Sequence, residues 1–320
     1  MNRSSLRCRL FCALLFAVLA ASPWPGKAED GGEVRDIRFV AYNLKNYQVG
    51  ADAPPKFGEG GVRVPGEGKP ESDIEALIEV IAGQRPDILG VCELGGEESL
   101  RDLKRRLREK GVNLHYHEFV AGPDEARHLA LLSRFPIKAR ASQPNLTYRI
   151  GSREFSMRRG ILDATIALAP GFDVRFIGVH LKSRRDLGEA DQRLMRRNEA
   201  YLIRRHADRI LAAEPDARLL VYGDFNDTRD QAPIKAVKGN VEKPTFLAGV
   251  PLVDRFGARW TYYWEEADTY ARYDFILASQ TLLPAIDKNP SRSYVASPGG
   301  WKKASDHRPL VVTIEAGEGR

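Results

Sequence analysis

Polar residues whose side chains could act on a phosphate ester recur at the ends of apolar runs. The clearest case is "LLVYGDFND" (219–227), in which apolar positions lead directly to two carboxylates and an amide. Each such residue alone has an ordinary explanation, because Asp, Asn and His often cap turns or end strands. As a set they are more informative: Asn43, Glu93, His180, Asp224, Asn226, Asp274, Asp306 and His307.

This combination of side chains suits metal-assisted hydrolysis of a phosphodiester. Hard divalent cations such as Mg²⁺ prefer oxygen ligands, usually one or two carboxylates together with water and substrate phosphate. Hydrolysis also needs an activated water and an acid for the leaving oxygen, roles that histidine and aspartate can fill. No Cys/His spacing indicates structural zinc, no GxSxG indicates a serine hydrolase, and no Walker loop is present.

The apolar runs that carry these residues are predicted to be β-strands, which would hold the strand-end side chains rigidly. The first is "DIRFVAYNLKNY" (36–47), and the run that ends in Glu93 is "PDILGVCELGG" (86–96). Further strands are predicted in 128–137, 160–168, 172–183, 219–224, 272–279 and 308–315. Strands therefore outnumber helices, and no linker divides the chain after its N-terminal segment.

Three helices and one long loop complete the expected elements. "SDIE" (72–75) has the spacing of a capping box and predicts a helix to about Gly83, and 97–110 predicts a charged helix. A long helix is predicted over 187–213, apolar at positions that include Leu187 and Tyr201, with its arginines mostly on a solvated face. The Gly/Pro-rich segment 48–70 is expected to be an extended loop.

The N-terminal residues 1–28 have the layout of a secretory signal peptide: three arginines, a short apolar run and small residues before Glu29. We therefore expect a secreted or periplasmic protein with one catalytic domain over 29–320. Removing the segment takes away four of the 49 bases and no acid, which leaves 45 bases against 43 acids. Net charge thus carries no argument for a nucleic-acid partner, and Cys92, the cysteine left in the mature chain, predicts no intramolecular disulfide.

The ordered motifs "YNLKNY", "ILGVCEL", "GVHLKS", "VYGDFND", "RYDFILAS" and "SDHRPL" resemble the endonuclease/exonuclease/phosphatase superfamily over nearly the whole mature chain. The resemblance implies an α/β fold, a four-layer sandwich of two mixed β-sheets packed face to face with helices outside. "GDFN" and "SDHRP" are its most specific pieces.

The resemblance also implies a role for each matched residue. Asn43, Glu93 and Asp306 match the metal side of the site. Asp224 matches the acid that positions or deprotonates the attacking water, and Asn226 the amide that holds a phosphate oxygen. His307 matches the histidine that contacts the phosphate and works with the nucleophile, oriented by Asp274.

Within the superfamily, "VHLKS" resembles the branch of pancreatic-type deoxyribonucleases and neutral sphingomyelinases more than AP endonucleases. That likeness implies that His180 is the general acid, paired with a carboxylate for which Glu125 is the candidate. Arg159 matches a phosphate-contacting arginine, with an ordinary surface arginine as the alternative. Cys92 replaces the glutamine that many members have, and we interpret it as a small buried hydrophobe.

These patterns together predict an exported phosphodiesterase that uses Mg²⁺, with Mn²⁺ or Ca²⁺ as alternatives, and acts as a monomer on DNA. Local basic residues flank the motifs: Arg158, Arg159, Lys182, Arg184, Arg185, Lys302 and Lys303. Trp301 and Tyr294 could stack on bases or pack beneath their loop. The alternatives are an enzyme for phospholipid headgroups or small phosphate esters, and a binding protein on an inactive scaffold; no stable membrane insertion is expected after signal removal.

Overall fold

The computed structural model describes residues 34–53, 55–57, 63–64, 66–186 and 188–317. The predicted signal peptide, residues 1–28, lies outside the described residues. The described residues belong to one compact unit. Among the helices of that part of the chain, none is long and apolar enough to cross a membrane.

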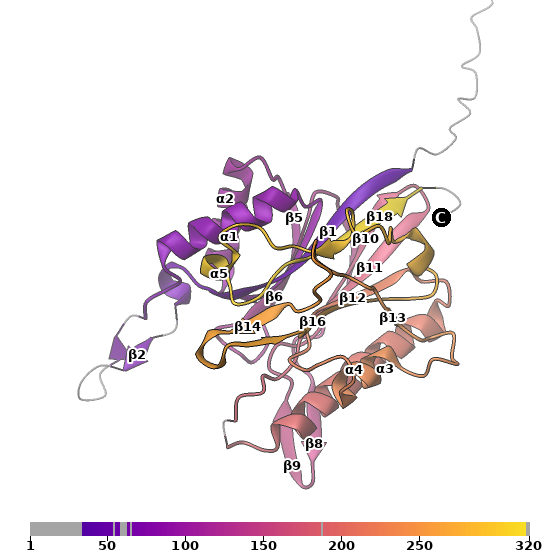
Figure 1. The fold of residues 1–320 in the computed structure, drawn as a ribbon. Helices are drawn as coiled ribbons and strands as arrows, with labels where there is room; N and C mark the ends of the chain where they lie inside the picture. The colour runs from indigo at the N-terminus through magenta and orange to yellow at the C-terminus, as the bar shows by residue number, and fades with distance from the viewer. Residues whose placement is uncertain (1–33, 54, 58–62, 65, 187, 318–320) are drawn as a thin grey trace, which may run out of the picture. The chain divides into compact units, whose positions relative to one another are not determined.

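Two six-stranded sheets form the centre of the structure (Figure 1). The strands of the first sheet, in spatial order, are β17 (Tyr294–Val295), β18 (Leu310–Ala316), β1 (Arg35–Tyr47), β4 (Ile88–Leu94), β6 (His128–Ser133) and β5 (Tyr116–Val120). Those of the second are β13 (Ala248–Gly249), β16 (Asp274–Ala278), β12 (Leu219–Asp224), β11 (Phe172–His180), β10 (Leu162–Ala169) and β7 (Ile137–Arg140). Both sheets are mixed, since β1 pairs with β4 and β11 with β12 in parallel while other neighbours are antiparallel.

Helices cover the outer face of each sheet. The helices are α1 (Glu71–Gln84), α2 (Glu97–Glu109), α3 (Gln192–Ala213), α4 (Ala232–Lys238) and α5 (Trp301–Ala304). Buried side chains of α1 and α2 cluster with one face of the first sheet, and those of α3 and α4 with one face of the second. The predicted four-layer α/β sandwich is confirmed.

Short elements connect these layers. Three hairpins pair β2 (Lys56–Phe57) with β3 (Arg63–Val64), β8 (Thr147–Ile150) with β9 (Arg153–Ser156), and β14 (Tyr262–Trp264) with β15 (Thr269–Ala271). The 3₁₀ turns are η1 (Gly50–Asp52), η3 (Glu265–Ala267) and η4 (Leu283–Ala285). Because η1, β2 and β3 lie within 48–70, that segment is not wholly extended loop as expected.

Alternating side chains of the central strands fill two different cores. On β1, Phe39 faces the other sheet and Val40 faces the helices, as period-two geometry requires. Between the sheets the ring of Phe39 lies 4.9 Å from that of Tyr222. Tyr222 fits because Gly90 has no side chain: a Cβ there would stand 2.1 Å from the tyrosine ring. Burial on both faces explains why these strands read as continuous apolar runs.

Two helix starts differ from the sequence expectations. The prediction of a capping box at residues 72–75 was wrong. Helix α1 begins at Glu71, and no side chain caps it. The carbonyl of Pro70 accepts the first helical N–H bonds. The long helix begins at Gln192 rather than at residue 187, because the Asp191 side chain accepts N–H bonds from Arg193 and Leu194 and so caps it.

The faces of α3 also differ from the expectation. Tyr201, predicted to be on the apolar face, is 49% exposed. Conversely, Arg196 and Arg204 are buried rather than solvated. Carboxylates and backbone carbonyls accept hydrogen bonds from their guanidinium groups, although Nε of Arg204 has no partner among the described residues. With Glu199, the helix therefore turns three of its charged residues inward, which sequence periodicity alone did not indicate.

Candidate active site

Strand register brings the predicted residues together. In the second sheet, His180 pairs with Asp224 across β11 and β12, and Asp224 pairs with Asp274 across β12 and β16. The three side chains therefore come from adjacent positions on three neighbouring strands. In the first sheet Asn43 pairs with Cys92, so that Glu93 follows at the same edge.

Several residues at these strand ends have left-handed backbone conformations. Glu93 has φ 59° and Asn226 has φ 50°, values that non-glycine residues seldom adopt. Gly223, with φ 136°, has no room for a side chain, since a Cβ would lie 1.9 Å from the carbonyl oxygen of Val179. Such strained conformations persist where the surrounding structure determines them strongly, and they commonly occur at functional sites.

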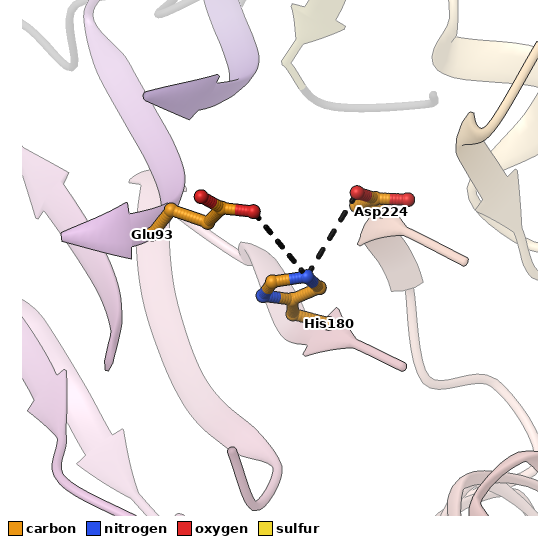
Figure 2. Close-up of side chains that lie close together, drawn as sticks. All are labelled: Glu93, His180 and Asp224. Atoms are coloured by element: carbon orange, nitrogen blue, oxygen red, sulfur yellow. Dashed lines mark ion pairs between the residues drawn. The ribbon is translucent and has the colours of Figure 1, made fainter. Parts of the chain in front are cut away.

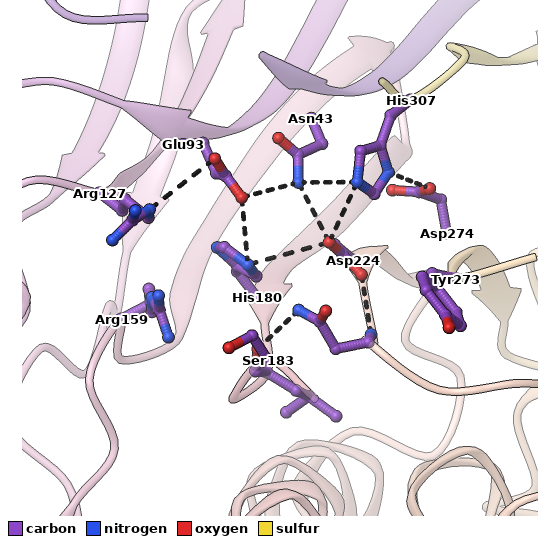
Figure 3. A network of polar contacts seen from close by, with 12 residues as sticks. Asn43, Glu93, Arg127, Arg159, His180, Ser183, Asp224, Tyr273, Asp274 and His307 are labelled. Atoms are coloured by element: carbon purple, nitrogen blue, oxygen red, sulfur yellow. Dashed lines mark hydrogen bonds and ion pairs between the residues drawn. The ribbon is translucent and has the colours of Figure 1, made fainter. Parts of the chain in front are cut away.

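Asn43 joins the two sheets at the centre of the cluster (Figure 3). Its amide nitrogen donates to Glu93 Oε1 at 3.2 Å and to Asp224 Oδ2 at 3.0 Å, and lies 3.4 Å from His307 Nε2. Its amide oxygen accepts the backbone N–H of Lys45 at 3.0 Å. Asn43 therefore holds two carboxylates together as a donor, and its predicted place among the metal-binding residues stays a prediction.

His180 lies between two carboxylates from different sheets (Figure 2). Its Nε2 is 3.7 Å from Glu93 Oε1 and 3.8 Å from Asp224 Oδ2, beyond ordinary hydrogen-bond length. Its buried Nδ1 has no hydrogen-bond partner among the described residues. His180 therefore lies beside both carboxylates without forming a hydrogen bond to either.

His307 has a tight carboxylate partner, as predicted. Its Nδ1 lies 2.7 Å from Asp274 Oδ2, and its Nε2 faces Asp224 Oδ2 at 3.7 Å. The ring of Tyr262 packs against the imidazole with centroids 4.9 Å apart. Asp274 thus orients the ring so that its second nitrogen points into the cluster.

The two histidines differ in electrostatic environment. Burial lowers the pKa of His180 well below its ordinary value, and the positive charges of Arg159 and Arg127 lower it further. Burial would also lower the pKa of His307, but the carboxylates of Asp274 and Asp224 outweigh it and raise that pKa to about 10. Burial raises the pKa of Asp224, against the lowering effect of His307. The neighbouring carboxylates therefore favour the protonated form of His307, whereas burial favours the neutral form of His180.

The carboxylates beside His180 are Glu93 and Asp224 rather than Glu125, the partner predicted for it. Glu125 is exposed, whereas its neighbour Asp124 is buried and pairs with the guanidinium of Arg159 at 3.0 Å. Arg159 is itself 6% exposed, so it is not an ordinary surface arginine. Arg127, which sequence reasoning missed, lies 3.8 Å from Glu93 Oε2 and is close to Arg159 and His180 (Figure 3).

Helix α3 supports the loop that follows His180. The Glu199 carboxylate accepts the backbone N–H of Lys182 at 2.6 Å, and Arg196 donates to the carbonyl of Ser183 at 3.1 Å and to Asp227 at 3.2 Å. Asn226 donates to the carbonyl of Leu181 at 2.9 Å, so the "GDFND" turn is tied to the same loop. The sequence did not indicate these roles for Arg196 and Glu199, because the charged residues of their helix were predicted to lie mostly on a solvated face.

The remaining predicted residues divide between the site and its surroundings. Asp306 is half-buried and is not a member of either metal-compatible group of described acids and histidines, so its metal role stays a prediction. Lys182 is buried, and its ammonium donates to the carbonyl of Arg185 at 3.2 Å. Tyr294 donates to Gln84 on α1 at 3.0 Å and so packs beneath its loop, as one alternative held.

The donor set fits a divalent cation. Ligand atoms of Glu93, His180 and Asp224 lie within 4.8 Å of one another, as do those of Asp224, Asp274 and His307. Contacts of 3.7–3.8 Å in the first group are too long for hydrogen bonds and suit side chains gathered around an ion. Carboxylate oxygens predominate, which favours Mg²⁺ or a similar hard cation.

Comparisons with known proteins bear on the fold and the family of the chain. A search of curated proteins finds no match. Among solved structures, the human Nocturnin catalytic domain with bound sulfate has 17% identity and a TM-score of 0.60, covering 89% of this chain and 97% of that chain. A beta toxin from Staphylococcus aureus has 15% identity and a TM-score of 0.57, with 87% and 99% covered. TDP2 from Caenorhabditis elegans has 14% identity and a TM-score of 0.57, with 88% and 75% covered.

These identities show a shared fold. The family model described as "Endonuclease/Exonuclease/phosphatase family" matches residues 68–289, more than half of the chain. The matched range carries Glu93, His180, Asp224 and Asp274, four of the clustered residues. With the sandwich fold and the polar cluster at its strand ends, this match establishes that the chain belongs to the endonuclease/exonuclease/phosphatase family.

Proposed function

We propose that this chain is an exported, divalent-metal-dependent phosphodiesterase that hydrolyses DNA. Its family consists of phosphoesterases that are generally metal-dependent. One observation carries the proposal: Asp224 Oδ2 lies 3.8 Å from His180 Nε2 and 3.7 Å from His307 Nε2. A carboxylate between two imidazoles, beside Glu93, can support both a nucleophilic water and a leaving oxygen.

The residues of the chain divide the work as follows. Glu93 and Asp224 would hold the cation, which neutralises phosphate charge when it is bound. Asp224 orients the attacking water, and His307, fixed by Asp274, contacts the phosphate. Asn226 uses one of its two amide N–H bonds on Leu181, and the other donates to a phosphate oxygen. His180 protonates the leaving oxygen once substrate is bound.

The choice of DNA depends on the cations around the cluster. Four basic residues flanking the motifs are exposed: Arg184, Arg185, Lys302 and Lys303. Exposed cations along a groove contact the phosphate backbone and make binding fall steeply with salt. A single headgroup phosphate would contact fewer of them, so its binding should depend less on salt.

The first experiment tests the metal and the site together. Excess chelator should abolish hydrolysis of supercoiled plasmid, and Mg²⁺ or Mn²⁺ should restore it. Glu93→Gln should lower kcat by about 10²–10³-fold, the scale of removing one preorganised electrostatic contact. The exposed Glu97→Gln on α2 is the matched control and should keep wild-type activity. Full activity of Glu93→Gln would remove Glu93 from the site.

A substrate panel separates DNA from the alternatives. Supercoiled plasmid, single-stranded RNA, sphingomyelin vesicles and a chromogenic phosphodiester should be compared at equal metal concentration. We expect DNA to be hydrolysed fastest. Strong hydrolysis of sphingomyelin without nicking of plasmid would instead support the headgroup enzyme.

Export is proposed from residues 1–28 alone. Expression of the full chain in a bacterial host, followed by cell fractionation and mass spectrometry of the N-terminus, tests it. A mature chain that starts at Glu29 in the periplasm or medium supports the proposal. An intact N-terminus in the cytoplasm contradicts it.

A further inference from the structure

A hollow of about 210 Å³ adjoins the cluster on the His307 side. Its aromatic lining comes from the β14 hairpin, with Tyr262, Tyr263 and Trp264, and from Trp301 at the start of α5. Tyr262 lines the hollow and also contacts the polar cluster, because its ring packs on His307. A group in the hollow would therefore be attached close to a phosphate bound at His307.

The aromatic walls are held in place before any ligand binds. Trp301 packs against Trp260 with ring centroids 5.2 Å apart, and the guanidinium of Arg308 lies 3.3 Å from the Trp260 ring centroid. Arg308 is in turn paired with Asp254 at 2.8 Å. The hydroxyl of Tyr263 donates to Asp268 at 3.0 Å. Such support reduces the entropy lost when a flat ring enters.

Charged side chains of both signs line the hollow. Lys45 and Lys302 line it and are exposed, and the Lys302 ammonium lies 4.4 Å from the Tyr263 ring centroid. Because Lys302 already covers that ring, a second cation is disfavoured there. The carboxylates of Glu265, Glu266 and Asp306 also line the hollow and would repel a phosphate placed inside it. They can accept hydrogen bonds from exocyclic amino groups instead.

We propose that this hollow binds one unpaired nucleobase of the nucleotide next to the scissile phosphate. The base stacks on the Trp264 and Trp301 side of the hollow, and the two lysines meet the flanking phosphates. The inference rests on the proposed nuclease function and narrows its substrate to single-stranded or frayed DNA, because a base inside a duplex cannot enter a side pocket without leaving its stack.

The test measures binding without cleavage. A fluorescently labelled single-stranded trinucleotide is titrated with the protein in chelator, and Kd is read from anisotropy. A second probe has the same phosphates but an abasic residue next to the central phosphate. Trp264→Ala is the chosen variant, because Trp264 is 50% exposed and its loss should not disturb folding. Tyr201→Ala, an aromatic residue 49% exposed on α3, is the matched control.

We expect Trp264→Ala to weaken binding of the intact probe by about 5- to 150-fold, the range for loss of one base–aromatic stack. The abasic probe should bind wild type more weakly by a similar factor, and Trp264→Ala should then add little. Tyr201→Ala should bind both probes like wild type. On cleavable substrates in Mg²⁺, wild type should prefer single strands, and Trp264→Ala should lose most of that preference.

Contrary outcomes are distinct from failure of the proposed function. If wild type cleaves DNA but Trp264→Ala binds both probes like wild type, the hollow is not a base site although the enzyme is a nuclease. If wild type neither binds nor cleaves DNA, the proposed function itself fails. If Trp264→Ala impairs only hydrolysis of a nitrophenyl phosphocholine ester, the hollow holds a cationic headgroup, and both proposals are overturned.

Discussion

The structure contains two buried histidine–aspartate pairs with different surroundings. His206 on α3 lies 2.6 Å from Asp163 on β10, and Arg175 donates to both oxygens of that carboxylate at 2.7 and 2.6 Å. His307 pairs with Asp274 at 2.7 Å, but its other nitrogen faces Asp224 at 3.7 Å. We call the first pair closed, because Arg175 supplies a counter-charge to its carboxylate. The second pair is open, because it lies beside further carboxylates and a second histidine, His180.

This difference shows that a buried acid–histidine pair is not by itself a site. In the closed pair the Arg209 guanidinium also reaches the second ring nitrogen of His206, at 3.4 Å. In the open cluster the second histidine, His180, keeps a buried Nδ1 with no partner among the described residues. Unsatisfied polar groups gathered in one place are costly for stability, so their presence favours a catalytic role.

The largest expected effect separates the histidines by reaction rate. His180→Ala and His307→Ala should each lower kcat on DNA by about 10²–10⁴-fold, whereas His206→Ala should leave kcat nearly unchanged. On a nitrophenyl phosphodiester, whose leaving group needs no proton, His180→Ala should keep far more activity than His307→Ala.

Steady-state kinetics of both variants on both substrates distinguishes the two roles. Because the pKa of free His180 is lowered, the negative phosphate must raise it before it can donate. If the two variants lose activity equally on both substrates, the assigned roles are wrong. Wild-type activity of His180→Ala on DNA would make His180 an ordinary strand-end histidine.

The next effect separates the aspartates by stability. Asp163→Ala removes the carboxylate partner of buried His206 and half-buried Arg175, and should lower the free energy of unfolding by about 3–5 kcal/mol. Asp224→Asn removes a buried charge that lies among other acids, so stability should stay constant or rise while activity is lost. Urea denaturation of both variants measures this, and a large stability loss in Asp224→Asn would contradict the comparison.

The smallest effect concerns Glu199, a buried carboxylate outside both pairs. Burial raises its pKa from 4.5 to about 7, so the folded state holds the proton more tightly than the unfolded state. Protonated Glu199 contributes its full share to the free energy of unfolding below about pH 4.5. That contribution is lost as pH rises through about 7, and the loss is roughly 3 kcal/mol at most. Glu199→Gln keeps an acceptor for Lys182 and should flatten this fall.

Urea denaturation at pH 5 and pH 8 measures that difference for Glu199→Gln and wild type. The exposed Glu214→Gln, at the residue that ends the same helix, serves as control and should follow wild type. An unchanged pH dependence in Glu199→Gln would show that its carboxylate is not the group that titrates.

Much of the fold and part of the site could be predicted from sequence. The strand runs ending in Glu93, His180 and Asp224 are real strands, and the order of motifs indicated the family and its sandwich. Local patterns suffice here because a strand buried on both faces must be apolar, and the polar residue that ends it marks the sheet edge. The pairing of His307 with Asp274 was predicted from the family resemblance instead.

Other features were decided only by the tertiary structure. Arg127, Arg196 and Tyr262 carry no local signal, and Asp124 rather than Glu125 is the buried acid beside Arg159. Asn43 has the predicted position, but its amide nitrogen, not its oxygen, faces the carboxylates. A sequence specifies which side chain is available at a strand end. Which partner it meets depends on residues that lie from 33 to 181 positions away in the sequence, because buried charges acquire their protonation and contacts from whatever the fold packs around them.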